Sequence, residues 1–131
     1  MELIFDMITN ENKEFYQLIG PFLGRREIEK EIGFQIYNKD GKVWFLAKKN
    51  DKVVGFCASE YRKNHSWFCS DYVISKYRNN GIYSALFNLR LHNTDGICKA
   101  SCTNDSLHQF LKSGFSEVRK NGKYTLVELR R

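Results

Sequence analysis

The sequence predicts a single α/β domain over residues 1–131, in which helices pack on a mixed β-sheet. With 131 residues, of which 42% are hydrophobic and 15% aromatic, the chain can bury one core without disulfide bonds. Its apolar residues change along the chain from helical spacing to strand-like runs and back. One helix separates the run that ends at Val73 from the run over residues 97–102, which predicts a parallel pair of strands within an otherwise antiparallel sheet.

The first third of the chain predicts one strand and two helices. Residues 2–6 form a short apolar strand. A helix capped by Thr9 or Asn10 follows, and Gly20-Pro21 ends or kinks it. Residues 25–32 form a second, highly charged helix. The positions of the first helix that have core spacing are Phe15, Leu18, Ile19 and Phe22.

The middle of the chain predicts three consecutive antiparallel strands. Residues 43–47 and 52–60 are apolar, β-rich runs joined by a turn over residues 49–51. A second turn at residues 62–64 leads into the third strand, which ends at Val73. This meander delivers the chain to a polar loop and then to a long helix.

The last third predicts a strand, a helix and a hairpin. The strand after the long helix leads to a helix that residues 104–106 cap and Gly114 stops. Residues 115–119 and 124–129 then form a hairpin around Asn121-Gly122. The complete order is β-α-α-β-β-β-α-β-α-β-β.

The loop between Val73 and the long helix has the features of an anion site. A helix N-terminus leaves backbone N–H groups unpaired at the positive end of the helix dipole. Gly81 has no Cβ, so the backbone can approach a ligand closely there. Between Asp71 and Asp95 the chain has no acidic residue, while its basic residues are Lys76, Arg78 and Arg90. The helix face with core spacing consists of Ile82, Ala85, Leu86 and Leu89.

Three segments resemble the GNAT acetyltransferase superfamily, whose element order this chain also shares. Arg78-Asn79-Asn80-Gly81-Ile82-Tyr83, after a strand that ends in Val73, resembles motif A of that family. Tyr83 departs from the motif, because the family usually has Gly or Ala there. The other two segments are Val54-Gly55 near the start of its strand, and Asn104-Asp105-Ser106 with Lys112-Ser113-Gly114-Phe115, which is similar to motif B.

The resemblance implies an N-acetyltransferase that moves an acetyl group from acetyl-CoA to a primary amine of a small molecule or protein. In the family, two parallel strands splay apart and the thioester inserts between them. The backbone near Val73 and Ser75 would then pair with the pantetheine arm, and the amides of residues 78–84 would wrap the pyrophosphate. The cofactor-binding residues implied are Val73, Ile74, Ser75, Arg78, Asn79, Asn80, Gly81, Ile82, Tyr83, Ser84, Asn104 and Phe110.

The reaction implied is direct attack of an unprotonated amine on the acetyl carbonyl, with a backbone N–H near Val73 stabilising the oxyanion. Asp71 is the predicted base, because it lies on the same strand face as Val73. Glu60 and His65 are alternative bases. Asp71 could instead serve only as an ion-pair partner for Lys76 or Arg78.

The departing sulfur needs a different explanation in this chain. Many family members protonate it with a tyrosine at the position of Phe110, which has no proton to give. Ser106 is the predicted replacement, and His108 and Tyr83 are alternatives. The thiolate could also leave unassisted or take a proton from water.

The charge distribution leaves further functions open. Residues 1–31 carry four basic and seven acidic side chains, whereas residues 32–131 carry seventeen and eight. The basic excess would suit the phosphates of coenzyme A, but also an acceptor amine on a nucleic acid. Phe110 and Tyr83 are compatible with a catalytically degenerate module that binds coenzyme A or a protein. The helix that contains Glu27, Glu29 and Glu31 would suit a cationic amine.

The remaining composition predicts a reduced, cytoplasmic protein. The four cysteines, Cys57, Cys69, Cys98 and Cys102, lie in predicted strands without zinc spacing, so we expect no metal site. No run of the sequence has the length of a membrane span, and its acidic start does not resemble a signal peptide. We expect a monomer, or a homodimer formed through an exposed final strand.

Overall fold

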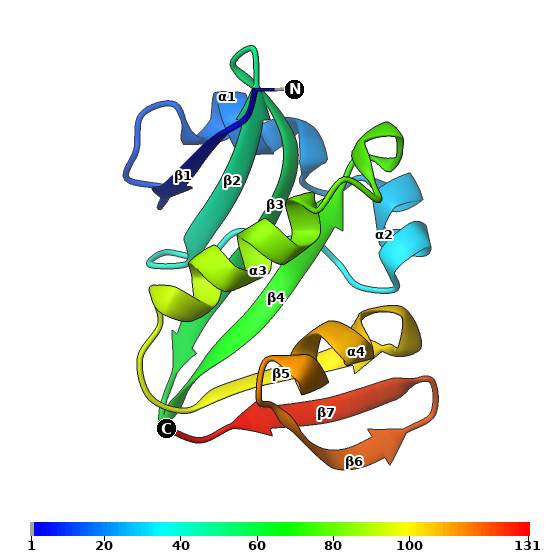
Figure 1. Ribbon diagram of the computed structural model, residues 1–131. Coiled ribbons are helices and arrows are strands. Elements are labelled where there is room, and N and C mark those ends of the chain that lie inside the picture. Colours follow the sequence, from blue (N-terminus) through cyan, green and yellow to red (C-terminus); the bar gives the residue numbers. More distant parts are fainter. Residues whose placement is uncertain (1) are drawn as a thin grey trace.

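The computed structural model describes residues 2–131 and confirms the predicted mixed α/β fold (Figure 1). Within this range the strands form one seven-stranded sheet in the order β1-β2-β3-β4-β5-β7-β6. Met1, which the predicted domain of residues 1–131 includes, lies outside the described residues. The strands are β1 (Ile4–Ile8), β2 (Val43–Lys49), β3 (Lys52–Arg62), β4 (His65–Val73), β5 (Cys98–Thr103), β6 (Ser116–Asn121) and β7 (Tyr124–Leu129). The α-helices are α1 (Phe15–Ile19), α2 (Arg26–Ile32), α3 (Ile82–His92) and α4 (Asn104–Lys112), and the 3-10 helices are η1 (Gly20–Phe22) and η2 (Ser75–Tyr77).

The parallel pair predicted across the long helix is present but short. β4 pairs with β5 in parallel, and within the described chain the ladder consists of Ser66 with Cys98, Trp67 with Lys99, and Phe68 with Ala100. Both strands continue beyond this ladder, β4 to Val73 and β5 to Thr103, without pairing to each other. The sheet therefore splits between its two central strands.

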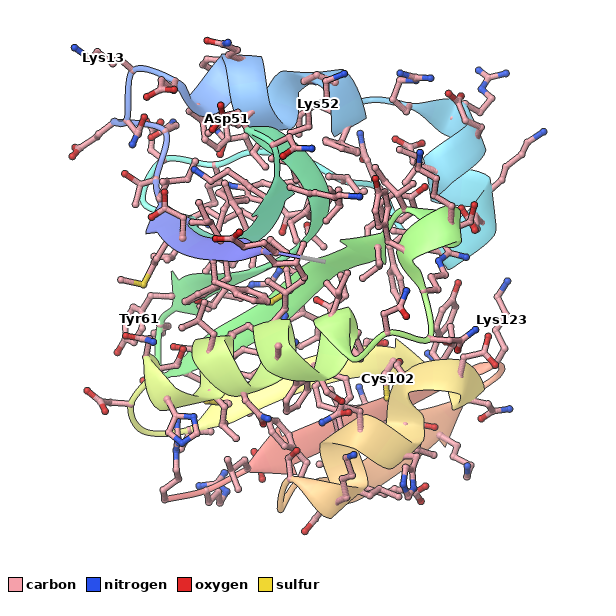
Figure 2. The ribbon with its side chains drawn as sticks, turned by 45° about the horizontal axis from the view of Figure 1, so that its top comes forward. Lys13, Asp51, Lys52, Tyr61, Cys102 and Lys123 are labelled. Atoms are coloured by element: carbon pink, nitrogen blue, oxygen red, sulfur yellow. The ribbon has the colours of Figure 1, made fainter. Side chains whose placement is uncertain are left out.

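Helices cover both faces of the sheet, and the pair of helices on each face packs against a separate apolar cluster. α1 and α2 cover one face, where Phe15, Ile19 and Ile28 pack against Trp44 and Phe56. α3 and α4 cover the other face, where Phe87 and Phe110 belong to one cluster. Cys102 of the same cluster lies between these two helices in Figure 2. The split between β4 and β5 thus connects the two covered faces.

The first helix begins later than predicted. Neither Thr9 nor Asn10 caps it, because α1 starts at Phe15. The side chains of Thr9 and Asn12 accept hydrogen bonds from the backbone N–H groups of Glu11 and Glu14, at 3.3 and 2.8 Å. These local side-chain bonds hold the segment in turns and replace the first helical turns.

Two further helix predictions were wrong in detail. On α3, Ala85 is exposed, and the buried positions are Ile82, Leu86, Phe87 and Arg90. An arginine enters the core because it finds a carboxylate there. On α4, Asn104 to Ser106 are the first helical residues rather than the cap, since β5 passes directly into the helix through Thr103.

Candidate functional site

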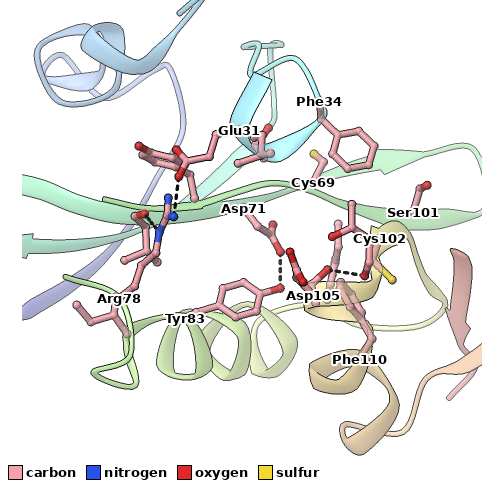
Figure 3. Close-up of a pocket in the computed structure, with 18 of the residues that line it drawn as sticks. Glu31, Phe34, Cys69, Asp71, Arg78, Tyr83, Ser101, Cys102, Asp105 and Phe110 are labelled. Carbon is pink, nitrogen blue, oxygen red and sulfur yellow. Dashed lines mark hydrogen bonds and ion pairs between the residues drawn. The ribbon is translucent and has the colours of Figure 1, made fainter. Parts of the chain in front are cut away.

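The split in the sheet contains a cavity of about 830 Å³ (Figure 3). Its walls come from β4, β5, the end of β3, α2, the loop after α2, the loop before α3, and the starts of α3 and α4. Ile74, Ser75, Asn80 and Asn104, which the sequence also predicted, are not among its lining residues. The predicted residues that line it are Asp71, Val73, Arg78, Asn79, Gly81, Ile82, Tyr83, Ser84, Ser106 and Phe110.

The cavity passes through the sheet and has two sides. We call the part formed by Asp71, Val73 and residues 78–84 the α3 side, because Asp71 and Val73 contact α3 residues. We call the opposite part the α2 side, and its lining residues are Glu31, Ile32, Phe34, Gln35, Tyr37, Arg62, Trp67 and Cys69. A ligand in the split can therefore reach both faces.

The start of α3 has room for an anion. Gly81 is the N-cap residue with φ 78°, and a Cβ built there would meet nothing within 4 Å. Asn79 also has a positive φ, 64°. The first turn of α3 contains no acidic side chain, so its free N–H groups and its dipole face open space. This cradle fits a phosphate group.

Two predicted residues near this cradle make other contacts. The N–H of Ile74 donates to the carbonyl of Val54 at 2.9 Å, so β3 already uses it. The side-chain amide of Asn80 donates to the carbonyl of Tyr77 at 3.3 Å and turns back onto its own loop.

The side chain of Arg78 joins β4 to α2. Its Nε donates to the carbonyl of Val73 at 2.7 Å, and Nη1 lies 2.6 Å from Glu31 Oε2 (Figure 3). The guanidinium also lies 5.5 Å from the ring centroid of Tyr72. Hydrogen bonding from Arg78 lowers the pKa of Glu31. Among the three glutamates that the sequence suggested for a cationic acceptor, Glu31 lines the cavity and Glu27 and Glu29 do not.

Asp71 has a different partner from those predicted. Its carboxylate binds neither Lys76 nor Arg78 but Arg90, at 2.6 Å and 3.0 Å from the two guanidinium nitrogens. Arg90 is fully buried, donates to the carbonyl of Ala58 at 3.1 Å and stacks on Phe68. The hydroxyl of Tyr83 donates to Asp71 Oδ2 at 2.8 Å (Figure 3). Burial and the charge of Asp71 raise the pKa of Tyr83 well above its usual range.

A β-bulge lies beside Asp71. Cys69 pairs with Ala58 and Tyr72 with Phe56, so β4 has one more residue than β3 between these pairs. Ser70 adopts a positive φ of 59° within it. A bulge disrupts the local ladder and turns the strand, which here happens where β4 leaves β5.

A buried lysine holds this bulge to the loop after α2. Lys42 is fully buried, and its Nζ donates to Ser70 Oγ at 2.9 Å and to the carbonyl of Tyr37 at 2.6 Å. The ammonium also lies 4.5 Å from the Trp44 ring centroid. Burial lowers the pKa of Lys42. The sequence shows no sign of this role, because Lys42 follows a polar turn and looks like a surface residue.

The α2 side contains a second charged cluster around Glu60. Glu60 is buried and accepts hydrogen bonds from the Tyr37 hydroxyl and from Arg62 Nη2, while Lys39 Nζ lies 3.4 Å away. Burial acts to raise the pKa of Glu60, but the hydrogen bonds from Tyr37 and Arg62 and the charge of Arg62 outweigh it, and the pKa is lowered. The guanidinium of Arg62 lies 4.4 Å from the Trp67 ring centroid.

The start of α4 contributes the last wall. Ser106 Oγ donates to the carbonyl of Thr103 at 3.4 Å, a long hydrogen bond. Phe110 is buried against Phe87 and Phe115 at centroid distances of 4.9 and 5.1 Å. Asp105 also lines the cavity, and the described part of the chain gives it no salt bridge. Sequence reasoning missed Asp105, although it lies between two predicted site residues.

Residues 5–115 match the model of the acetyltransferase (GNAT) family. The chain belongs to this family. A search of curated proteins finds no match.

Solved GNAT-like structures have the same fold over nearly the whole chain. Escherichia coli ElaA is 13% identical with a TM-score of 0.79, covering 98% of this chain and 100% of its own. An acyl-CoA N-acyltransferase from Pseudomonas aeruginosa is 13% identical with a TM-score of 0.77, covering 98% and 99%. A GNAT family acetyltransferase from Elizabethkingia anophelis with acetyl-CoA bound is 16% identical with a TM-score of 0.63, covering 98% of each chain. The GNAT resemblance drawn from the motifs is thereby confirmed.

None of the helices in residues 2–131 has both the length and the apolar character needed to cross a membrane. The same residues contain no group of three or more His, Cys, Asp or Glu side chains placed to hold a metal ion.

Proposed function

We propose that this protein transfers an acetyl group from acetyl-CoA to a primary amine. The observation that carries the proposal is the continuous cavity through the split sheet. It joins the open cradle at the start of α3 to an aromatic-walled space on the opposite face. GNAT family membership supports CoA-dependent acetyl transfer, and the Elizabethkingia anophelis structure contains acetyl-CoA.

The cofactor would lie on the α3 side. Backbone N–H groups of residues 78–84 would hold the pyrophosphate, with Gly81 leaving the space in front of them open. The edge of β4 near Val73 and Ser75 would bind the pantetheine arm, and Asn104 and α4 would flank it. Phe110 would pack against the apolar part of that arm.

The acceptor amine would reach the acetyl carbonyl from the α2 side. The amine nitrogen forms the new bond to the carbonyl carbon, the C–S bond breaks, and the amine proton is lost. Beyond Phe68, β4 has no strand partner on its β5 edge within the described residues, so N–H groups there are free to stabilise the oxyanion. Positioning of the two reactants supplies much of the rate.

The contacts argue against Asp71 as the base. Both of its oxygens are engaged by Arg90, and one also accepts from Tyr83. Glu60 is a poor base as well, because its pKa is lowered. We assign Asp105 as the base that accepts the amine proton, because it lines the cavity without a salt-bridge partner in the described residues. Asp71 then serves to position Tyr83.

The proton for the departing thiolate has two sources in this scheme. Ser106 lines the cavity and has a weakly held hydroxyl, since its hydrogen bond to Thr103 is 3.4 Å long. Water is the other source. Phe110 cannot take part, and the raised pKa of Tyr83 makes it a weak acid.

The proposal is tested by calorimetry with acetyl-CoA on the wild type and on Gly81→Glu. The carboxylate introduced at Gly81 would occupy the cradle and repel phosphate, so we expect at least about a hundredfold loss of affinity. Gly96→Glu is the matched control, because Gly96 has φ 73°, also with nothing within 4 Å, but lies in the α3–β5 loop.

The outcomes separate three readings. Binding lost only in Gly81→Glu, with turnover on an amine panel, supports the proposal. Binding without turnover on any amine supports a catalytically inactive module instead. A folded wild type that does not bind acetyl-CoA contradicts the proposal.

A further inference from the structure

We propose that the acceptor amine also carries a carboxylate, and that Arg62 binds this carboxylate on the α2 side of the cavity. The inference rests on the proposed function and names its substrate class. The acceptor would be an amino acid or a related aminocarboxylate with an apolar or aromatic body.

The charge balance on the α2 side favours an anion. Two cations, Lys39 and Arg62, lie 3.4 and 2.9 Å from one carboxylate, Glu60. A third, Lys42, donates to the carbonyl of Tyr37, whose hydroxyl binds Glu60. Glu60 is 3% exposed, and its oxygens already face Tyr37, Arg62 and Lys39. The excess of positive charge has no carboxylate partner within this cluster.

Arg62 is the cation of this cluster that a ligand in the cavity can reach. Lys42 is fully buried and bonded to Ser70 and Tyr37, and neither Lys42 nor Lys39 lines the cavity. Arg62 lines it, and its side chain is 42% exposed. It donates to Glu60 through Nη2 at 2.9 Å. Its other N–H groups remain for a bidentate or single contact with a carboxylate.

The neighbouring walls fix the guanidinium and define the body of the acceptor. The guanidinium of Arg62 lies 4.4 Å from the Trp67 ring centroid and is bonded to Glu60, so little side-chain freedom is lost on binding. Phe34, Tyr37 and Trp67 line this part of the cavity. Aromatic surfaces suit an apolar or flat ligand body between the amine and the carboxylate.

The other carboxylates near the cavity do not cancel this charge. Glu31 is paired with Arg78, and Asp71 with Arg90. Asp105 belongs to α4, across the split from the Glu60 cluster, where it would face the amine. The cavity thus has a cationic end on β3 and an acidic group at the start of α4, matching the two ends of an aminocarboxylate.

The test compares amines that differ by one carboxylate. Acetylation is measured with phenylalanine against phenethylamine, tryptophan against tryptamine, and lysine against cadaverine, in the wild type and Arg62→Gln. We expect the wild type to prefer the carboxylate member of at least one pair by about tenfold or more in kcat/KM. In Arg62→Gln that preference falls to about one, mainly through KM, while the KM for acetyl-CoA is unchanged.

Lys39→Gln is the matched control, since it removes another cationic partner of Glu60 at a position that does not line the cavity. It should keep the wild-type preference, and Arg62→Lys should keep part of it. A wild type that acetylates each decarboxylated amine as well as its partner, or an Arg62→Gln variant that retains the preference, overturns the inference.

A second readout does not depend on turnover. N-acetylphenylalanine and N-acetylphenethylamine are titrated calorimetrically into the protein with and without coenzyme A. Tighter binding of the carboxylate compound that disappears in Arg62→Gln supports the inference even if the proposed function fails in the acetyl-CoA experiment. Equal binding of the two compounds, or binding of neither at millimolar concentration, contradicts it.

Discussion

The α3 side of the cavity is built from one continuous stretch of chain, whereas the α2 side is assembled from separated segments. Asp71 to Ser84 supply the strand end, the loop and the helix start in unbroken order. The α2 side takes its residues from α2, from the loop after α2, from Arg62 of β3, and from Trp67 and Cys69 of β4. The first side works mainly through backbone groups and the second through side chains.

This difference indicates which side of the cavity can change its amino-acid sequence without losing the ability to bind the acetyl donor. A backbone cradle depends on φ angles and on a helix end, and many side chains are compatible with it. A side-chain wall changes with every substitution. We therefore expect the α3 side to fix the donor and the α2 side to select the acceptor, and four experiments can break or sharpen this contrast.

The largest effect is expected for Arg90→Met, which removes the buried ion pair with Asp71 next to the α3 side. Removing Arg90 leaves the Asp71 carboxylate without its buried partner, so we expect a loss of about 3–5 kcal/mol in unfolding free energy. Urea denaturation measures it. Asp71→Asn with Arg90→Met should recover much of the loss, and a double variant as unstable as Arg90→Met would show that Arg90 acts through packing alone.

The next largest effect concerns the base. Asp105→Asn should lower kcat about a hundredfold at neutral pH, with less loss at high pH where the free amine is abundant. Asp71→Asn should change kcat less and leave the shape of the pH–rate profile intact. If Asp71→Asn alone removes the acidic limb of the profile, Asp71 is the base and the assignment to Asp105 is wrong.

Lys42→Met separates the two sides directly. The variant keeps most of the buried volume but removes the bonds to Ser70 and Tyr37, so the loop after α2 loses its attachment to the bulge. We expect KM for the acceptor to rise about tenfold while the Kd for acetyl-CoA stays the same. A loss of acetyl-CoA affinity of similar size would show that the two sides are coupled.

The smallest effect is expected for Glu60→Gln, at about 1 kcal/mol of stability at neutral pH. Hydrogen bonds from Tyr37 and Arg62 lower the pKa of Glu60 against the opposing effect of burial. At pH values above 4.5, the ordinary pKa of a glutamate, the charged form of Glu60 therefore stabilises the fold. This contribution is lost as the pH falls through the lower pKa that Glu60 has in the folded protein. Thermal unfolding from pH 7 to 3 should show the two proteins converging, and a gap that widens toward acid would contradict this sign.

The contrast also explains what the sequence could predict. The meander, the parallel pair, the motif around Gly81 and the hairpin are local patterns, and the family followed from them. Arg62 and Lys42 could not be found in this way, because their neighbours Trp67 and Ser70 come from another strand. The partner of Asp71, Arg90, lies nineteen residues away on α3. It is buried with Ile82 and Leu86, but a charged residue is not expected in the core from apolar spacing.

The short ladder between β4 and β5 has a consequence for amide hydrogen exchange. With pairing limited to residues 66–68 and 98–100 in the described chain, the β5-facing amides of β4 beyond Phe68 have no strand partner. These amides should exchange rapidly in the free protein, while the β3-facing amides of the same strand stay protected. Binding of acetyl-CoA along this edge should slow the first group selectively, so alternate residues of one strand would report whether the ligand pairs as an added strand.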